Sequence, residues 1–176
     1  MFRSRATSFG LLLAGTLPLV AYSQVYMTED QAAKSMLPGE AGIRKMIELT
    51  PAEIGKIENQ SGEKVRNSTV VAWVTSARNV LFVDQVLGKH EFITYAVGIS
   101  KDKKVTAIDI LEYRETYGQG VKAPEWRKQF VGKDSTAPLR LKTDIINISG
   151  ATLSSAHITG GVRRLLQTYE VIRTRL

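Results

Sequence analysis

The change in hydrophobic period at Val70 constrains the fold more than any other feature of the sequence. From that point, segments 70–75, 79–88, 91–99 and 104–113 are rich in β-branched and aromatic residues and partly alternate between apolar and polar positions. Short polar runs separate these segments, which is typical of strands joined by tight turns. The pattern predicts an antiparallel meander.

The end of the chain has the spacing of a long amphipathic helix. Its apolar face consists of Ile158, Val162, Leu165, Leu166, Tyr169 and Ile172, and its polar face contains Arg163, Arg164, Gln167 and Arg173. Gly160 and Gly161 inside this helix each cost about 1 kcal/mol relative to alanine. We therefore expect another group to approach the helix backbone closely at these glycines.

These two patterns predict the α+β class, with an antiparallel, half-barrel-like sheet packed against the C-terminal helix. Two short helices are expected before the sheet. Thr28 is the N-cap of the first, which ends before Pro38, and Thr50 is the N-cap of the second, with Glu53 at the capping-box position and Gly62 after its end. The predicted core consists of Trp73, Phe82, Phe92, Ile108, Ile110, Val162, Leu165 and Tyr169.

Residues 1–23 are predicted to be a cleaved signal peptide. Arg3 and Arg5 precede an apolar run over 9–21; at about 13 residues, this run is well short of the roughly 20 that a membrane-spanning helix needs. Ala21 and Ser23 are small, which favours cleavage before Gln24. A mitochondrial transit peptide is the second interpretation, less favoured because the run is continuously apolar. We expect periplasmic localisation, a helical segment over 24–69 and the main domain over 70–176.

The composition excludes several kinds of site. The chain has no cysteine, so thiolate metal sites, iron–sulfur clusters and disulfides are excluded, and its two histidines, His90 and His157, are too few for a His-rich metal site. Its net charge of +7 is spread along the chain without a dense basic run or an aromatic platform, so we expect no nucleic-acid partner. His90 is expected in a hairpin loop, and His157 either on the surface or in a hydrogen-bonding role near a ligand.

Two segments remain as candidates for a site. The long loop over 114–134 is rich in glycine and contains a short helix around 125–130, where Trp126 and Phe130 share one face. Trp126 either fixes this helix to the core or contacts a ligand. The second segment, Ser149–Thr152, leads into the final helix, where free backbone N–H groups and the helix dipole favour a phosphate. The alternative is that Ser149, Thr152, Ser154 and Ser155 are only helix caps.

The sequence SGATLSS over 149–155 resembles the flavinylation motif of the FMN-binding domain family, known from the flavin-carrying subunits of the sodium-translocating NADH:quinone reductase and the Rnf complex. The resemblance extends over about residues 91–172, because segment 144–166 follows the family's order of strand, motif and helix, and RETYGQG resembles its glycine loop. It implies that Thr152 carries FMN through a phosphoester. The other implied cofactor-binding residues are Ser149, Gly150, Ala151, Leu153, Ser154, Ser155, Glu115, Thr116, Gly118 and Trp126.

The resemblance also implies a function and partners. The chain would be a periplasmic electron carrier with covalent FMN and no substrate-specific catalysis. A Mg-dependent flavin transferase would attach FMN taken from FAD, and a membrane or periplasmic redox protein would exchange electrons with it. Ile146 stands where the family has an acidic residue, which leaves Asp144 as the nearest carboxylate. The alternative function is a periplasmic adaptor module that binds no flavin or holds a ligand noncovalently.

Overall fold

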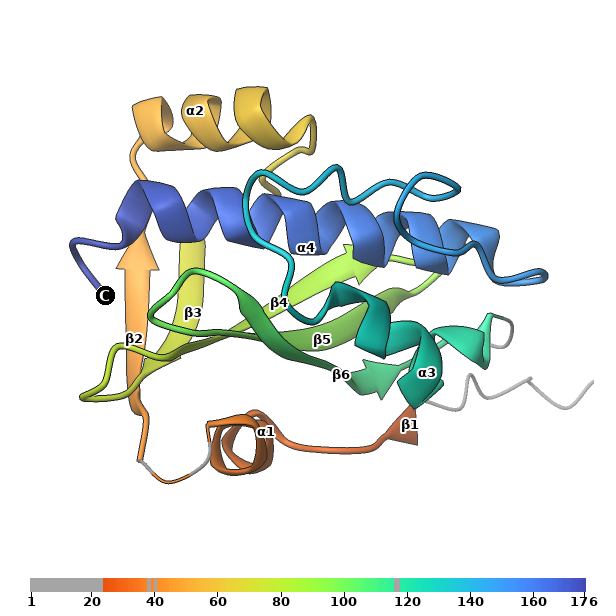
Figure 1. Ribbon diagram of the computed structural model, residues 1–176, viewed down its shortest axis with the longest axis horizontal. Coiled ribbons are helices and arrows are strands. Elements are labelled where there is room, and N and C mark those ends of the chain that lie inside the picture. The colour runs from red at the N-terminus through yellow and green to blue at the C-terminus, as the bar shows by residue number, and fades with distance from the viewer. Residues whose placement is uncertain (1–23, 38, 40, 116–117) are drawn as a thin grey trace, which may run out of the picture.

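The fold is built on one antiparallel sheet of six strands in the order β1-β6-β5-β4-β3-β2 (Figure 1). The computed structural model describes residues 24–37, 39, 41–115 and 118–176, so the expected signal peptide lies outside the described residues. The strands are β1 Gln24–Val25, β2 Ile43–Glu48, β3 Thr69–Val74, β4 Val80–Leu87, β5 Phe92–Ile99 and β6 Val105–Tyr113. The predicted meander is confirmed as β3 to β6, and the α+β class with it.

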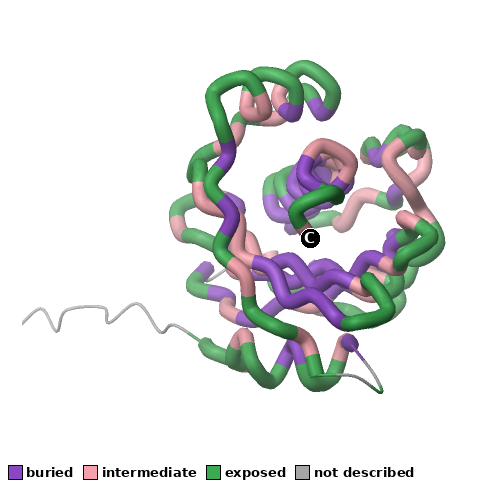
Figure 2. The backbone as a smooth tube through the Cα atoms, turned by 90° about the vertical axis from the view of Figure 1, so that its left-hand side faces the viewer, coloured by how far each residue is buried: buried purple, intermediate pink, exposed green. Residues whose placement is uncertain are grey.

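Helices lie on both faces of the sheet. The long helix α4 packs against one face, with α2 outside it, and α1 covers the opposite face (Figures 1 and 2). The helical elements are α1 Glu29–Met36, α2 Pro51–Ser61, η1 Gln119–Lys122, α3 Pro124–Arg127, η2 Lys128–Phe130 and α4 Thr152–Ile172. None of the helices formed by the described residues is long and apolar enough to cross a membrane.

Both N-terminal helices begin and end where the sequence predicts. Thr28 and Gln31 form a capping box at α1, and Thr50 and Glu53 form one at α2, whose C-cap Gly62 has a φ of 71°. Segment 24–69 also supplies strands β1 and β2, which the sequence does not predict. β2 pairs with β3 from Ile43↔Val74 to Glu48↔Thr69, so the sheet continues across the expected boundary at residue 69, and β2 is one of its two edge strands.

The buried residues form two clusters, one on each face of the sheet. The larger lies between the sheet and α4 and contains Phe82, Ile108, Ile110, Val162, Leu165 and Tyr169, as predicted. The smaller lies under α1, where Trp73 packs with Leu81 and Leu111. The prediction that Phe92 is a core residue is wrong, because 43% of its surface is exposed. Alternation along β5 turns Ile93 and Tyr95 towards α4 and leaves Phe92 on the opposite face, outside the cluster under α1.

The two helix glycines meet close neighbours, as expected. A Cβ at Gly160 would collide with the carboxylate of Glu63, and one at Gly161 would collide with the hydroxyl of Tyr95 and lie 2.9 Å from Val86 Cγ1. These contacts allow α4 to lie directly against the sheet on one side and the loop after α2 on the other.

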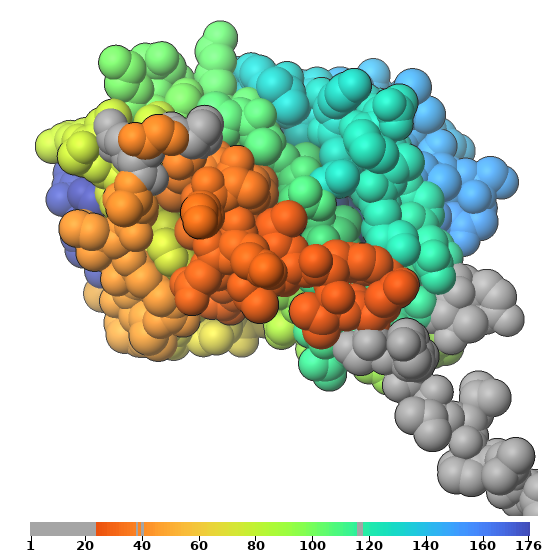
Figure 3. All heavy atoms as spheres, turned by 90° about the horizontal axis from the view of Figure 1, so that it is seen from below, coloured from red at the N-terminus to blue at the C-terminus, as the bar shows by residue number. Residues whose placement is uncertain are grey.

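The strand expected before the SGAT motif is absent. Segment 144–148 makes only an isolated bridge between Ile145 and Leu141, because side chains take up its backbone groups. Trp126 Nε1 donates to the carbonyl of Ile146 at 2.8 Å, and the N–H of Ile146 donates to Gln129 Oε1 at 2.8 Å. The short helical loop therefore fixes the approach to α4. Figure 3 shows this loop beside the N-terminal residues, where Lys122 Nζ donates to the Tyr26 hydroxyl at 2.7 Å.

Candidate functional site

The start of α4 differs from the starts of α1 and α2. Its first residue is Thr152, its N-cap is Ala151, and no side chain among the described residues caps it. The interpretation of the motif as simple helix caps is therefore wrong. The N–H groups of the first turn and the positive end of the dipole of this 21-residue helix remain available to an outside anion.

A cleft of about 240 Å³ opens at this helix end. Three parts of the chain line it: the β4–β5 turn, the glycine loop and the SGAT motif. The lining residues are Lys89, Gly118, Gly150, Ala151, Thr152, Leu153 and Ser154. The fold thus brings six of the predicted cofactor-binding residues together and adds Lys89, whose ammonium group suits an anion. Lys89 was not predicted as a site residue, because it lies in a short polar run beside His90 and belongs to no motif.

The Thr152 hydroxyl is exposed and oriented by Asn147. Asn147 Nδ2 donates to Thr152 Oγ1 at 3.2 Å, and Asn147 Oδ1 accepts a hydrogen bond from Ser155 Oγ at 3.1 Å. Ser155 also donates to the carbonyl of Ala151 at 2.8 Å, so it faces away from the cleft. Asn147 was not predicted as a site residue, because a single asparagine in a short polar segment has no distinctive pattern.

Gly118 packs against the floor of the cleft. Its φ is 86°, and a Cβ there would lie 2.7 Å from Tyr113 Oη and 2.8 Å from Ser154 Oγ. These two oxygens are 3.3 Å apart and hydrogen-bonded. Burial raises the pKa of Tyr113, so the phenol stays neutral at physiological pH. Only glycine fits this position without displacing the Tyr113–Ser154 pair.

Glu115 supports the site from behind. It is buried and outside the cleft lining, and its Oε1 accepts the N–H groups of His90 at 2.5 Å and Glu91 at 3.0 Å. Burial opposes ionisation of this carboxyl, but the hydrogen bonds from the backbone outweigh burial and lower its pKa. The ionised carboxylate fixes the turn that contains Lys89. Its neighbour Thr116 lies outside the described residues.

The other predicted side chains lie around the cleft rather than in it. Trp126 packs edge to face on Phe130, with ring centroids 5.0 Å apart, and fixes the preceding segment through Ile146. This geometry favours the structural role for Trp126. Ser149 is exposed outside the cleft lining. His157 Nδ1 donates to the carbonyl of Leu87 at the end of β4, so its ring supports the same turn as Glu115.

Asp144 does not replace the acidic residue absent at Ile146. Its Oδ2 is 2.9 Å from Lys133 Nζ, and its Oδ1 accepts the N–H of Arg140 at 2.8 Å. Burial opposes ionisation, but these bonds and that from the N–H of Leu139 lower the pKa of Asp144. The carboxylate is thus committed to the 139–144 turn. Ile146 is 71% exposed.

Comparison with known proteins agrees with this site. A model of the FMN-binding domain family matches residues 88–167, a range that includes every residue lining the cleft. The chain is 32% identical over 143 residues to the G-type subunit of the Na⁺-translocating ferredoxin:NAD⁺ oxidoreductase complex of Acetobacterium woodii. The alignment covers 76% of this chain and 62% of that protein, so the chain spans less than two thirds of its relative's length.

Proposed function

Because residues 88–167 belong to the FMN-binding domain family, we propose that this protein is an exported electron carrier whose FMN is joined by a phosphoester to Thr152 Oγ1. When bound, FMN supplies reversible uptake and release of electrons, and the protein supplies position and electrostatics. The observation that supports the proposal most directly is the exposed Thr152 hydroxyl at the uncapped start of α4.

The residues present fit the phosphate end of FMN. A phosphoester on Thr152 would lie beside the free N–H groups of the first turn of α4 and the cleft that Lys89 lines. Leu153, which lines the cleft beside Thr152, is 48% exposed and offers apolar surface to an aromatic ring. The packing of Gly118 on Ser154 keeps the floor of the cleft fixed.

Among the described residues, no carboxylate or imidazole group is hydrogen-bonded to the Thr152 hydroxyl. Asn147 is the side chain that bonds Thr152 Oγ1, and an amide does not take up a proton. In the step, the Thr152 oxygen forms a bond to the FMN phosphorus of FAD, the pyrophosphate bond breaks and AMP leaves. A Mg-dependent flavin transferase as maturation partner would supply the group that takes up the hydroxyl proton.

Export and electron exchange complete the proposal. The predicted signal peptide would place the mature protein in the periplasm, and its relative is named as part of an oxidoreductase complex. We infer a membrane or periplasmic redox partner and no substrate-specific catalysis by this chain. The alternative, an adaptor that holds a ligand noncovalently, predicts a flavin-free protein or a flavin released on denaturation.

The test is the intact mass of the exported protein coexpressed with a flavin transferase. Thr152→Ala and Thr152→Val should both lack the flavin mass, because neither has the acceptor oxygen. Thr152→Val keeps the shape of the side chain, and since no cap is lost we expect its free energy of unfolding to lie within about 0.5 kcal/mol of wild type. Thr143→Val, an exposed threonine outside the cleft, is the matched control and should stay modified. An unmodified wild type, or a flavin retained on either Thr152 variant, refutes the assignment.

A further inference from the structure

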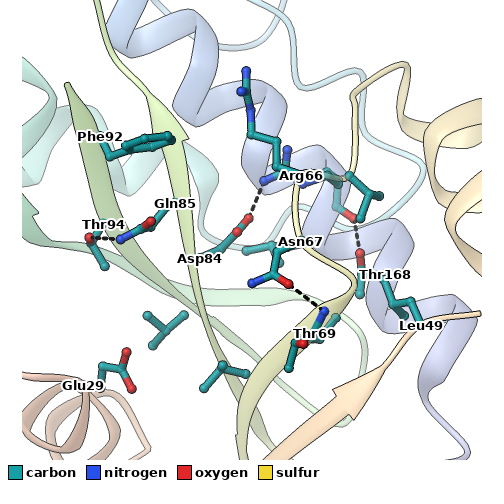
Figure 4. A pocket seen from close by; sticks show the side chains of 16 residues that line it. Glu29, Leu49, Arg66, Asn67, Thr69, Asp84, Gln85, Phe92, Thr94 and Thr168 are labelled. Atoms are coloured by element: carbon teal, nitrogen blue, oxygen red, sulfur yellow. Dashed lines mark hydrogen bonds and ion pairs between the residues drawn. The ribbon is translucent and has the colours of Figure 1, made fainter. Parts of the chain in front are cut away.

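A second cavity, of about 420 Å³, opens between β3 and β4 (Figure 4). The ladder between these strands runs only from Val71↔Val83 to Val74↔Val80. Beyond it, Thr69 and Val70 pair with β2 alone, and residues 84–87 pair with β5 alone. The two strands therefore diverge and leave a wedge between them.

Arg164 of α4 connects the two sides of this wedge, and its neighbour Arg163 fixes the loop after α2. Arg164 is buried, donates from Nη1 to the carbonyl of Lys64 at 2.9 Å and contacts Asp84 Oδ2 through Nη2 at 2.5 Å. Its guanidinium thus connects the loop before β3 with β4. Arg163 donates to the carbonyl of Ser61 and contacts Glu63, each at 2.6 Å. Because the walls are bonded to α4 on both sides, the cavity exists before any ligand enters it.

The walls combine apolar surface with a few polar groups. Val70, Val71 and Val83 contribute β-branched side chains, and Phe92, which is 43% exposed overall, also lines the cavity. Two amide side chains also line it: Gln85 Nε2 donates to Thr94 Oγ1 at 3.0 Å, and Asn67 Oδ1 accepts the N–H of Thr69 at 2.9 Å (Figure 4). A volume of this size and such a lining are typical of sites for small organic molecules. The exposed Phe92 ring favours an aromatic ligand.

Two carboxylates and two guanidinium groups line the cavity, and three of these four charges have an opposite charge beside them. Asp84 is paired with Arg164, and Glu29 lies 3.6 Å from Arg44. Arg66 lines the cavity and is exposed, and within the described part of the chain its guanidinium has no carboxylate partner. A ligand with one anionic group would therefore find an unpaired guanidinium at the mouth.

We propose that this cavity binds a small aromatic anion, with its ring against Phe92 and its anionic group at Arg66. The site is separate from the cleft at Thr152, because Arg164 lies more than three turns further along α4, about 18 Å along the helix axis. Binding here does not depend on flavin attachment, so the two proposals can fail independently.

The probes are 1-naphthoate and its neutral isostere 1-naphthamide, titrated into the purified protein and followed by the shifts of backbone amide signals in NMR. Naphthoate should shift the signals of Gln85, Phe92 and Thr94 and leave that of Thr143 in place. Naphthamide should act at the same residues but bind about fivefold more weakly, the effect of one partly screened ion pair.

Two substitutions measure the contributions of the Arg66 charge and the Phe92 ring to binding separately. Arg66→Gln should bring naphthoate affinity down to that of naphthamide, while Phe92→Ala should weaken both probes. Arg140→Gln and Val131→Ala change an exposed arginine and an exposed apolar residue elsewhere and should alter neither. Circular dichroism checks that each variant is folded. The proposal is overturned if wild type shows no saturable shifts, if the shifts lie outside the cavity, or if Arg66→Gln preserves the preference for naphthoate.

Discussion

Gly118→Ala should destabilise the protein by about 2–3 kcal/mol, through two separable effects. The first is backbone strain, because a residue with a Cβ at a φ of 86° costs about 1–2 kcal/mol. The second is the contact of the new Cβ with Tyr113 Oη and Ser154 Oγ, 2.7 and 2.8 Å away. Relieving it requires these oxygens to separate, with the loss of a buried hydrogen bond of about 1 kcal/mol.

Gly132→Ala is the matched control for the strain alone. Gly132 has a φ of 81°, close to that of Gly118, but a Cβ there meets no atom within 4 Å. Its substitution should therefore cost only the strain of about 1–2 kcal/mol. The difference between the two variants measures the contact beneath the cleft.

The assay is urea unfolding monitored by circular dichroism, with the free energy of unfolding extrapolated to water. Tyr113→Phe removes one of the two oxygens that the new Cβ would meet. Gly118→Ala should therefore lower the free energy of unfolding less in the Tyr113→Phe background than in wild type. Equal losses for Gly118→Ala and Gly132→Ala, or an unchanged loss in the Tyr113→Phe background, would refute the reasoning.

Two further predictions concern the pH dependence of stability and the packing of α4. The pKa of Glu115 is lowered from 4.5 by the bonds from the turn, so its contribution to stability is present above about pH 4.5 and is lost as the pH falls through the lower value of the folded state. Unfolding free energies between pH 3 and 7 should therefore fall less steeply towards acid in Glu115→Gln than in wild type, and parallel curves would exclude this role. Gly161→Ala should destabilise by about 2 kcal/mol or more, because its Cβ collides with Tyr95. Gly55→Ala in α2, where a Cβ meets no atom within 4 Å, should stabilise by about 0.5–1 kcal/mol; a loss of stability in Gly55→Ala would contradict the helix-propensity argument.

Local chemistry explains which parts of the fold the sequence predicts. The capping boxes at Thr28 and Thr50 act within one helical turn, so their pattern is visible in the sequence. Strand β1 is too short to show a period, and in β2 only Ile47 among the strand residues is buried, so neither strand has the alternation that marks a half-buried strand.

The candidate site likewise contains residues that the sequence predicts and residues that only the fold brings in. Thr152 and its neighbours are adjacent in the chain, and a family motif identifies them. The glycine loop resembles its family counterpart, so Gly118 is predicted as well. Lys89 belongs to no motif, and only the pairing of β4 with β5 and the packing of α4 bring it to the cleft. The prediction that Phe92 is a core residue was wrong because alternation along a strand does not show how far a covering helix extends.

The edge strand β2 has a consequence for the behaviour of the protein in concentrated solution. Ile43 and Met46 are 71% and 63% exposed on a strand whose outer edge pairs with no strand among the described residues, an arrangement that invites intermolecular β-pairing and aggregation. Lys45 lies between these two apolar side chains and pairs with no carboxylate among the described residues, so two molecules that met edge to edge would bring like charges together. The positive charge of Lys45 thus opposes self-association along this exposed strand.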